Sequence, residues 1–310
     1  MSGIDDFNKY YSALSAIFLT TFGLTGNLIV LYVYTRKTFS SVPMFRYYAI
    51  SVIFETLELL LIWPFNYPDF FQFNQNSVSC KTVQYFAYLF GEFISWIGVV
   101  ISVDRFISIK YTHQYQIRKK LSFQIKVLSI IFLISSLIYS PYLIFNDLTT
   151  SESNETFCVV EDTITSIWIH VADFFISTLI PFIIMIILSC ITGYYLINNK
   201  TKLNLKKFKK EKRLYKILIS MNIFFFLCYF PWSAYVITND VYILNNISAD
   251  YMSIVYNITN FIIFLYCSCS FFVHLICNRK FRSYLLACLK FKNETVNLVP
   301  NSYFIETKNL

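Results

Sequence analysis

The chain has 310 residues, of which 56% are hydrophobic and only 14% are charged, and its mean hydropathy is +0.53. Soluble domains carry roughly 25% charged residues, so a water-exposed surface is excluded for most of this chain, and lipid is the expected solvent. The net charge of +8 does not indicate a nucleic-acid partner, because the cations lie in short loops between apolar segments, as in membrane proteins.

Patterns of catalytic or metal-binding residues are missing from the sequence. The three histidines, His113, His170 and His274, fall in different segments. The eight cysteines include no CxxC pair and no Cys/His group with zinc spacing. The sequence also lacks HExxH, GxSxG and phosphate-loop motifs. We therefore expect no catalytic residues and no bound metal cluster, and we predict that the protein is not an enzyme.

Seven apolar segments are long enough to cross a bilayer, which takes about 20 residues in a helix. They cover residues 11–35, 46–67, 78–110, 123–145, 165–197, 213–238 and 250–277, and a short amphipathic stretch follows at 279–290. The prediction is an all-α membrane protein, a seven-transmembrane helix bundle with a short amphipathic eighth helix. Residues 1–10 would form the N-terminal segment, 11–290 the membrane domain and 291–310 a tail.

The distribution of Lys and Arg indicates the orientation of the chain. With the N-terminus outside, the inner segments 36–46, 105–126, 199–216 and 279–310 carry 3, 6, 9 and 6 of these residues, 24 of the 26 in the chain. Cytoplasmic loops of membrane proteins are enriched in cations. We predict a multi-pass plasma-membrane protein with an extracellular N-terminus and a cytoplasmic tail.

Short motifs mark the first three spans. The first contains Gly26-Asn27, and the second contains the acid Glu55 in the run Val52–Leu57. The third has Cys80 near its outer end and Asp104-Arg105-Phe106 at its inner end. At 1.5 Å per residue, Cys80 and Arg105 are roughly 37 Å apart along a helix, about a full bilayer.

The later spans add a proline in the fifth, Pro181, and the run Phe225–Pro231 in the sixth, where Pro231 permits a kink. Together these motifs resemble those of the rhodopsin-like (class A) G-protein-coupled receptors over roughly residues 20–290. The segment Ser270–Arg282 is similar to the corresponding part of invertebrate neuropeptide receptors.

The resemblance implies a polar core and an outer disulfide. Asn27 would pair with Glu55, the acid that forms the sodium site of the family. We expect no cofactor apart from such an ion, and the alternative is a Glu55 satisfied by its neighbours without an ion. Cys80 would form a disulfide with Cys158 in the second outer loop, an oxidising location. Beside it, Asn154-Glu155-Thr156 is a candidate glycosylation site.

The resemblance also implies an activation and coupling apparatus for a heterotrimeric G protein. Its members would be Asp104, Arg105 and Phe106 at the inner end of the third span, with Phe225, Tyr229 and Pro231 in the sixth. Glu211 lies 20 residues before Pro231, roughly 30 Å along a helix, which would place it near Arg105, and an ion pair between them is one hypothesis. The alternative is an acid solvated in a Lys-rich loop.

The seventh span departs from the family pattern. The positions usually held by Asn-Pro-x-x-Tyr carry Ser270, Phe271 and His274, and Ser189 stands where the fifth span often has Tyr. These departures put the tyrosine-based activation contacts in doubt, so a non-signalling or orphan chemosensory receptor remains an alternative. A channel or transporter is a further alternative, opposed by the cation distribution and by a content of only six glycines.

Within the family, the residues at a few positions distinguish receptors for different classes of ligand. Amine receptors carry an Asp where this chain has Ala87, and opsins carry a Lys where it has Ile263. Three acids, Glu58, Glu92 and Asp173, lie within the predicted spans, where charges are expensive and are functional candidates. An acidic outer mouth steers cationic ligands, and we propose a short peptide with Arg or Lys, in amidated form, as the agonist. The alternative is that the loop acids are solvated surface, which is the preferred interpretation for them, and that the intramembrane acids pair with Tyr or Ser.

The inner surface offers a lipid contact and a modification site. The run Lys206-Lys207-Phe208-Lys209-Lys210 suits anionic membrane lipids, although positive-inside sorting also explains it. Cys288 at the end of the amphipathic stretch is a palmitoylation candidate, and an unmodified thiol is the alternative.

Overall fold

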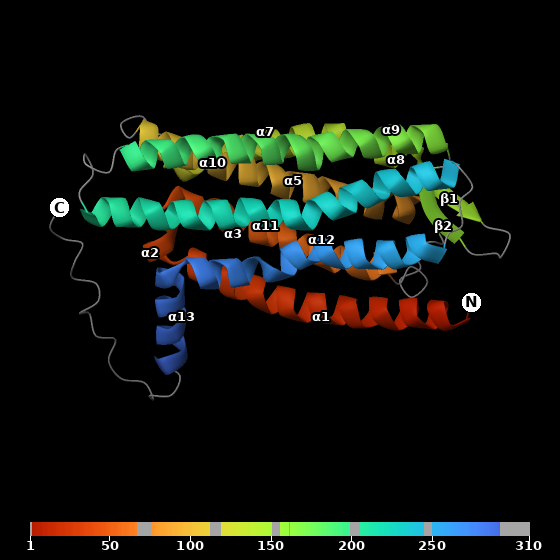
Figure 1. Ribbon diagram of the computed structural model, residues 1–310, viewed down its shortest axis with the longest axis horizontal. Helices are drawn as coiled ribbons and strands as arrows, with labels where there is room; N and C mark the ends of the chain where they lie inside the picture. Colours follow the sequence, from red (N-terminus) through yellow and green to blue (C-terminus); the bar gives the residue numbers. More distant parts are fainter. Residues whose placement is uncertain are drawn as a thin grey trace.

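The structure is a bundle of long helices that run side by side along one axis (Figure 1). It is a computed structural model, and it describes residues 2–66, 76–111, 119–150, 156–160, 162–198, 205–244 and 250–291. The N-terminus lies at the same end as a small β-hairpin, and the helices α2 and α13 lie at the opposite end (Figure 1). We call these the hairpin end and the α13 end.

In chain order the helices are α1 (Ser2–Tyr34), α2 (Lys37–Ser40), α3 (Pro43–Asn66), α5 (Ser77–Lys110), α7 (Leu121–Ile138), α8 (Pro141–Phe145), α9 (Thr163–Asp173), α10 (Ile180–Asn198), α11 (Leu205–Leu244), α12 (Asp250–Cys277) and α13 (Arg279–Phe291). Strands β1 (Asn146–Thr150) and β2 (Thr156–Val160) form the hairpin, and a π-helical segment, Phe174–Leu179, joins α9 to α10. The helical bundle and the amphipathic α13 confirm the predicted fold class.

Six stretches of the described residues are long and apolar enough to cross a membrane: Tyr10–Tyr34, Ser77–Lys110, Leu121–Phe145, Thr163–Asn198, Leu205–Asn239 and Ile254–Cys277. The remaining predicted span corresponds to α3, whose 24 residues reach about 36 Å at 1.5 Å per residue. Arg46, Glu55 and Glu58 reduce the hydropathy of this helix. Its length still suits a span, and it packs between α1 and α5.

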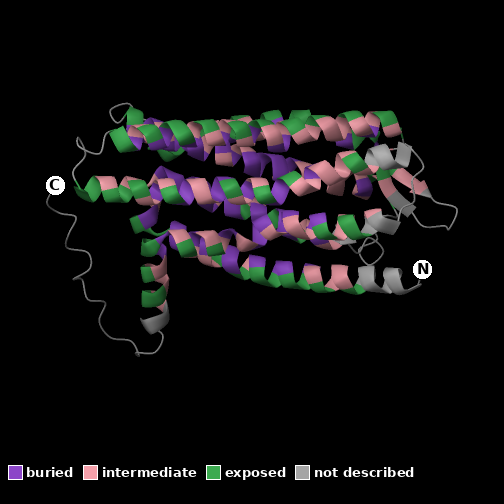
Figure 2. Ribbon diagram, in the orientation of Figure 1, coloured by how far each residue is buried: buried purple, intermediate pink, exposed green. Residues whose placement is uncertain are grey.

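Burial follows the expectation for a membrane solvent. Large apolar side chains such as Leu133, Leu137 and Trp168 are exposed on the outside of the bundle, while many polar ones are buried inside it. Figure 2 shows exposed residues along the outward sides of the helices and buried ones between them. Helix α5 is the central element, since it contacts α3, α7, α8, α10 and α11.

Two spans are built differently from the prediction. The fourth span was expected as one helix over 123–145, but α7 ends at Ile138 and Pro141 begins the separate α8. Proline has no N–H to donate to the carbonyl four residues back, and it is tolerated in a first helical turn. In the fifth span, the π-helical segment follows Asp173 directly, and such bulges often occur at functional sites.

The hairpin was also not predicted, and it is fastened to the bundle at several points. The predicted disulfide Cys80–Cys158 is confirmed, with a Cα–Cα distance of 5.6 Å, and it ties β2 to α5. Asp147 on β1 accepts a hydrogen bond of 2.8 Å from Ser77 and pairs with Lys81 at 3.6 Å. The Ser77 hydroxyl, the Leu148 N–H and Lys81 lower the pKa of Asp147.

The close approach of α1 to α3 and α12 depends on Gly23. A Cβ at this position would overlap Leu59 Cδ1 and lie 3.1 Å from Ser268 Cα, whereas a Cβ at Gly91 would meet nothing nearer than 3.5 Å. We expect Gly23→Ala to destabilise the protein by about 1–3 kcal/mol through overpacking, and Gly91→Ala to be neutral or slightly stabilising. Thermal unfolding of both purified variants checks this, and equal unfolding temperatures would contradict it.

Candidate functional site: an acidic pocket and an inner ion pair

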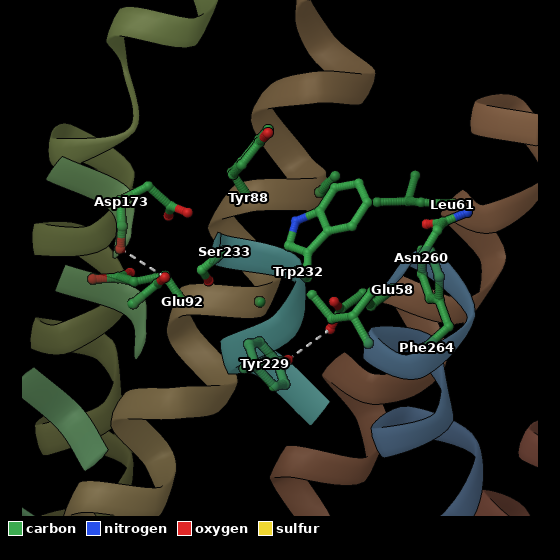
Figure 3. Close-up of a pocket in the computed structure, with 14 residues that line it drawn as sticks. Glu58, Leu61, Tyr88, Glu92, Asp173, Tyr229, Trp232, Ser233, Asn260 and Phe264 are labelled. Atoms are coloured by element: carbon green, nitrogen blue, oxygen red, sulfur yellow. Dashed lines mark hydrogen bonds between the residues drawn. The ribbon is translucent and has the colours of Figure 1, made fainter. Parts of the chain in front are cut away.

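A pocket opens between α3, α5, α9, α11 and α12, in the half of the bundle nearer the hairpin. About 650 Å³ of space, including the open mouth, is free of protein atoms there. All three acids singled out in the sequence, Glu58, Glu92 and Asp173, line it (Figure 3). The other walls are largely apolar or uncharged, with Tyr88 and Trp232 among them.

The acids Glu92 and Asp173 share one side of the pocket (Figure 3). Asp173 Oδ1 accepts a hydrogen bond of 2.5 Å from the hydroxyl of Tyr139, and Ser177 donates to the Asp173 carbonyl across the π-helical segment at 2.8 Å. Glu92 is 2% exposed. Its Oε2 has no hydrogen-bond partner among the described residues.

Glu58 lies on the other side of the pocket and joins three helices. Its Oε2 accepts a hydrogen bond from Cys267 Sγ on α12 at 3.3 Å and a long one from the Tyr229 hydroxyl on α11 at 3.5 Å. A bond of that length is weak. Tyr229 is two residues before Pro231, which lies inside α11 without ending it.

The polar core beneath the pocket differs from the expected pairing. Glu55 accepts hydrogen bonds from Ser51 and from Ser270 on α12, both at 2.8 Å. The amide of Asn27 donates instead to Thr56 at 3.2 Å, and Asn27 Oδ1 has no partner among the described residues. The expected Asn27–Glu55 pair is therefore wrong in this structure, because the Asn27 amide is directed at Thr56 and Glu55 bonds to Ser51 and Ser270.

An ion-pair group lies near the α13 end of the bundle. Arg105 and Asp104 are both buried, and Arg105 Nε donates to Asp104 at 3.1 Å. Arg105 Nη1 also lies 3.8 Å from Glu211 Oε2 on α11, which confirms the predicted contact between the two residues. Phe106, the next residue, packs near Tyr195 and beneath the ammonium of Lys110. The group links α5 to α11.

Sequence reasoning missed a second polar link between these helices. Asn222 Nδ2 donates to Ser189 on α10 at 3.0 Å and more weakly to Ser102 on α5 at 3.4 Å. All three residues are buried. A lone Asn in the apolar run nine residues before Pro231 was the available signal, because polar side chains in membrane helices usually bond across helices.

Aromatic rings surround the remaining predicted switch residues. Phe225 stacks on Tyr229 with ring centroids 4.5 Å apart, and both rings contact Tyr266. His274 is fully buried, with its ring edge-on to Tyr34 and Tyr48 at 5.1 and 4.7 Å. Its two ring nitrogens have no hydrogen-bond partner within the described part of the chain.

Of the two candidate modification sites, Cys288 lies among the described residues and Asn154 does not. Cys288 is a free thiol on the amphipathic α13.

The bundle has a pocket toward one end and a buried Asp-Arg pair toward the other. This arrangement fits a polytopic membrane receptor, and comparison with known proteins agrees. The sequence model of the seven-transmembrane receptors of the rhodopsin family matches residues 26–272, and the chain belongs to this family. No curated protein is significantly similar to it. Members of the family are signalling receptors and not enzymes, so the prediction that the protein is not an enzyme is confirmed. Membership of a receptor family also excludes the channel and transporter alternatives.

The Glu55–Ser270 contact provides a test of the polar core. Ser270→Ala would leave a buried carboxylate oxygen without its donor, which costs about 1–3 kcal/mol. The matched control is Ser268→Ala, since that hydroxyl donates only to the backbone carbonyls of Leu19 and Phe264. We expect a larger fall in unfolding temperature for Ser270→Ala; an equal or smaller fall would show that Glu55 does not depend on Ser270.

Proposed function

We propose that this protein is a plasma-membrane receptor, with its N-terminus and hairpin end outside the cell, that passes the binding of a short basic peptide to a heterotrimeric G protein. The observation that carries the proposal is the pocket, which is lined by the buried carboxyl groups of Glu58 and Glu92 and by the half-buried one of Asp173. Buried charges in a membrane protein are costly and mark functional sites. A cationic ligand would provide these carboxyl groups with a charge partner from outside the bundle.

The composition of the pocket also supports an amidated peptide. Its described lining includes Glu58, Glu92 and Asp173 but no Lys, Arg or His. A free C-terminal carboxylate entering this space would meet like charges without a cation to offset them. An amide end is uncharged and can bond to neutral groups such as Asn260 and Ser233. The same acids would attract the basic side chains of the peptide.

The proposed mechanism connects the pocket to the ion pair through α11. Tyr229 contacts Glu58 in the pocket and stacks on Phe225 below it. A ligand that displaces Tyr229 would reposition α11 about Pro231, where one helical hydrogen bond is missing. The inner half of α11 would then move away from α5. Arg105, released from Glu211, would engage the G protein together with Asp104 and Phe106.

The cations at the α13 end support the proposed membrane orientation. The first turns of α11 carry Lys206, Lys207, Lys209 and Lys210, and α13 begins with Arg279-Lys280. This distribution suits the cytoplasmic face and its anionic lipids. We also propose palmitoylation of Cys288, which would anchor α13 to that surface, and glycosylation of Asn154 on the opposite face.

A sodium ion beside Glu55 remains part of the proposal. The carboxylate of Glu55 and the hydroxyl oxygens of Ser51 and Ser270 are close together. Hard cations prefer oxygen ligands of this kind. The two serine protons now directed at Glu55 would turn away from a bound cation, so the ion and the present hydrogen bonds exclude each other.

The signalling proposal is tested in transfected cells with a library of short, amidated, basic peptides. We expect at least one peptide to activate a G protein through the wild-type receptor, and Arg105→Ala to abolish the response at equal surface expression, because Arg105 is the proposed contact with the G protein. Silence of the wild type, despite full surface expression, would contradict the proposal. It would favour a non-signalling receptor, in keeping with the unpartnered His274.

The ion pair is tested by Glu211→Ala. Removing this carboxylate frees α11 from Arg105, and we expect basal G-protein activity without ligand to rise several-fold. The matched control is Lys212→Ala, which alters the charge at an exposed neighbouring position. Unchanged basal activity in Glu211→Ala, at equal expression, would show that the pair does not hold the receptor in its inactive form.

A further inference from the structure

The acids of the pocket form two separate groups. Figure 3 shows Glu92 and Asp173 on one side and Glu58 on the other, with Ser233 and Trp232 between them. Glu58 lies on α3, whereas Glu92 lies on α5 and Asp173 ends α9.

Helix geometry explains this separation. Glu58 Oε1 lies 3.5 Å from the place where a Cβ on Gly91 would be, so Glu58 reaches α5 at the face of residue 91. Glu92 is the next residue, and successive side chains on an α-helix point about 100° apart. The side chain of Glu92 therefore leaves α5 in another direction, toward Tyr139 and Asp173.

The first group has an unmet requirement for a partner. Glu92 is 2% exposed and lines the pocket, yet its Oε2 has no hydrogen-bond partner among the described residues. A buried charged oxygen without a partner is unfavourable. Asp173 beside it, held by Tyr139, adds a second carboxyl. A cationic group placed here would contact both acids.

The second group is Glu58, whose present hydrogen bonds are weak, so a stronger donor could replace them. Glu58 is 5% exposed, and its Oε2 receives only a thiol at 3.3 Å and the long bond from Tyr229. Thiols are weak donors. An ammonium or guanidinium at this oxygen would replace weak contacts with a charge-assisted one, which is shorter and stronger.

We propose that the ligand segment that enters this pocket carries two cationic groups joined by an uncharged spacer, one group binding Glu92 and Asp173 and the other binding Glu58. The inference rests on the proposed function and names the chemistry of its ligand. The spacer crosses the wall formed by Trp232, Ser233 and Gly91. Two sources supply this chemistry: a peptide end with a free α-amine and a basic side chain, or a free aliphatic diamine.

The test measures binding to the purified full-length receptor by thermal shift, which needs no G protein. The first probes are lysinamide, which has two cations, and Nα-acetyl-lysinamide, which has one. The second are diaminoalkanes of increasing length and the n-alkylamines of equal length. We expect the dication of at least one pair to reach half-maximal shift at a roughly tenfold lower concentration, since a buried charge pair is worth that much or more. The better pair identifies the source.

Variants decide whether the two acid groups cause this advantage. In Glu58→Gln and in Glu92→Gln the dication should lose its advantage and bind as the monocation does, while Asp147→Asn, an acid on the hairpin, should keep it. The monocation shift in each variant shows that the variant is folded. Equal potency of dications and monocations in the wild type, or an advantage that survives in both pocket variants, would overturn the inference.

The outcome is separable from that of the signalling assay. A dication advantage without any G-protein response would support the inference and contradict the proposed function. A peptide that activates a G protein, combined with equal binding of dications and monocations, would support the proposed function and contradict the inference.

Discussion

The hydrocarbon solvent is the constraint on which this structure depends. Lipid offers no hydrogen bonds, so backbone groups must be satisfied within helices and polar side chains must face other helices. Leu133, Leu137 and Trp168 are accordingly exposed, while Glu55, Arg105 and many other polar residues are buried. Each buried polar residue therefore needs a hydrogen-bond or charge partner, which either another helix or a ligand provides.

The ionisable residues inside the bundle form two sets, one near the α13 end and one in the pocket, and they differ in their partners. At the α13 end, Arg105 has acids on two sides, Asp104 and Glu211, and the group is self-contained. In the pocket, the hydrogen bonds that Glu58 and Asp173 accept come from uncharged hydroxyl and thiol groups. Under the proposed function, the first arrangement would stabilise the resting bundle and a ligand would complete the second. Helix α11 takes part in both through Tyr229 and Glu211, and this is the route by which a ligand would affect the ion pair.

Much of the fold could be predicted from the sequence, because hydropathy shows which segments lie in lipid and the positions of Lys and Arg indicate which loops face the cytoplasm. The spans, the Cys80–Cys158 disulfide and the Arg105–Glu211 contact were predicted. The hairpin and the π-helical segment were not predicted, since both depend on tertiary contacts, which the hydrophobic periodicity of the sequence does not reveal. The partner of Glu55 was predicted wrongly: motif resemblance suggested Asn27, but the longer glutamate side chain reaches Ser270. Asn222 was missed because Asn at this position belongs to none of the recognised motifs.

The most direct test of the account is the distance between the inner ends of α5 and α11, measured by electron paramagnetic resonance between spin labels at Lys110 and Lys206. Both side chains are exposed. In the wild type without ligand we expect one short distance population, and in Glu211→Gln a second, longer population, because the ion pair to Arg105 is lost. An identical distance distribution in the two proteins would contradict the claim that this pair restrains α11.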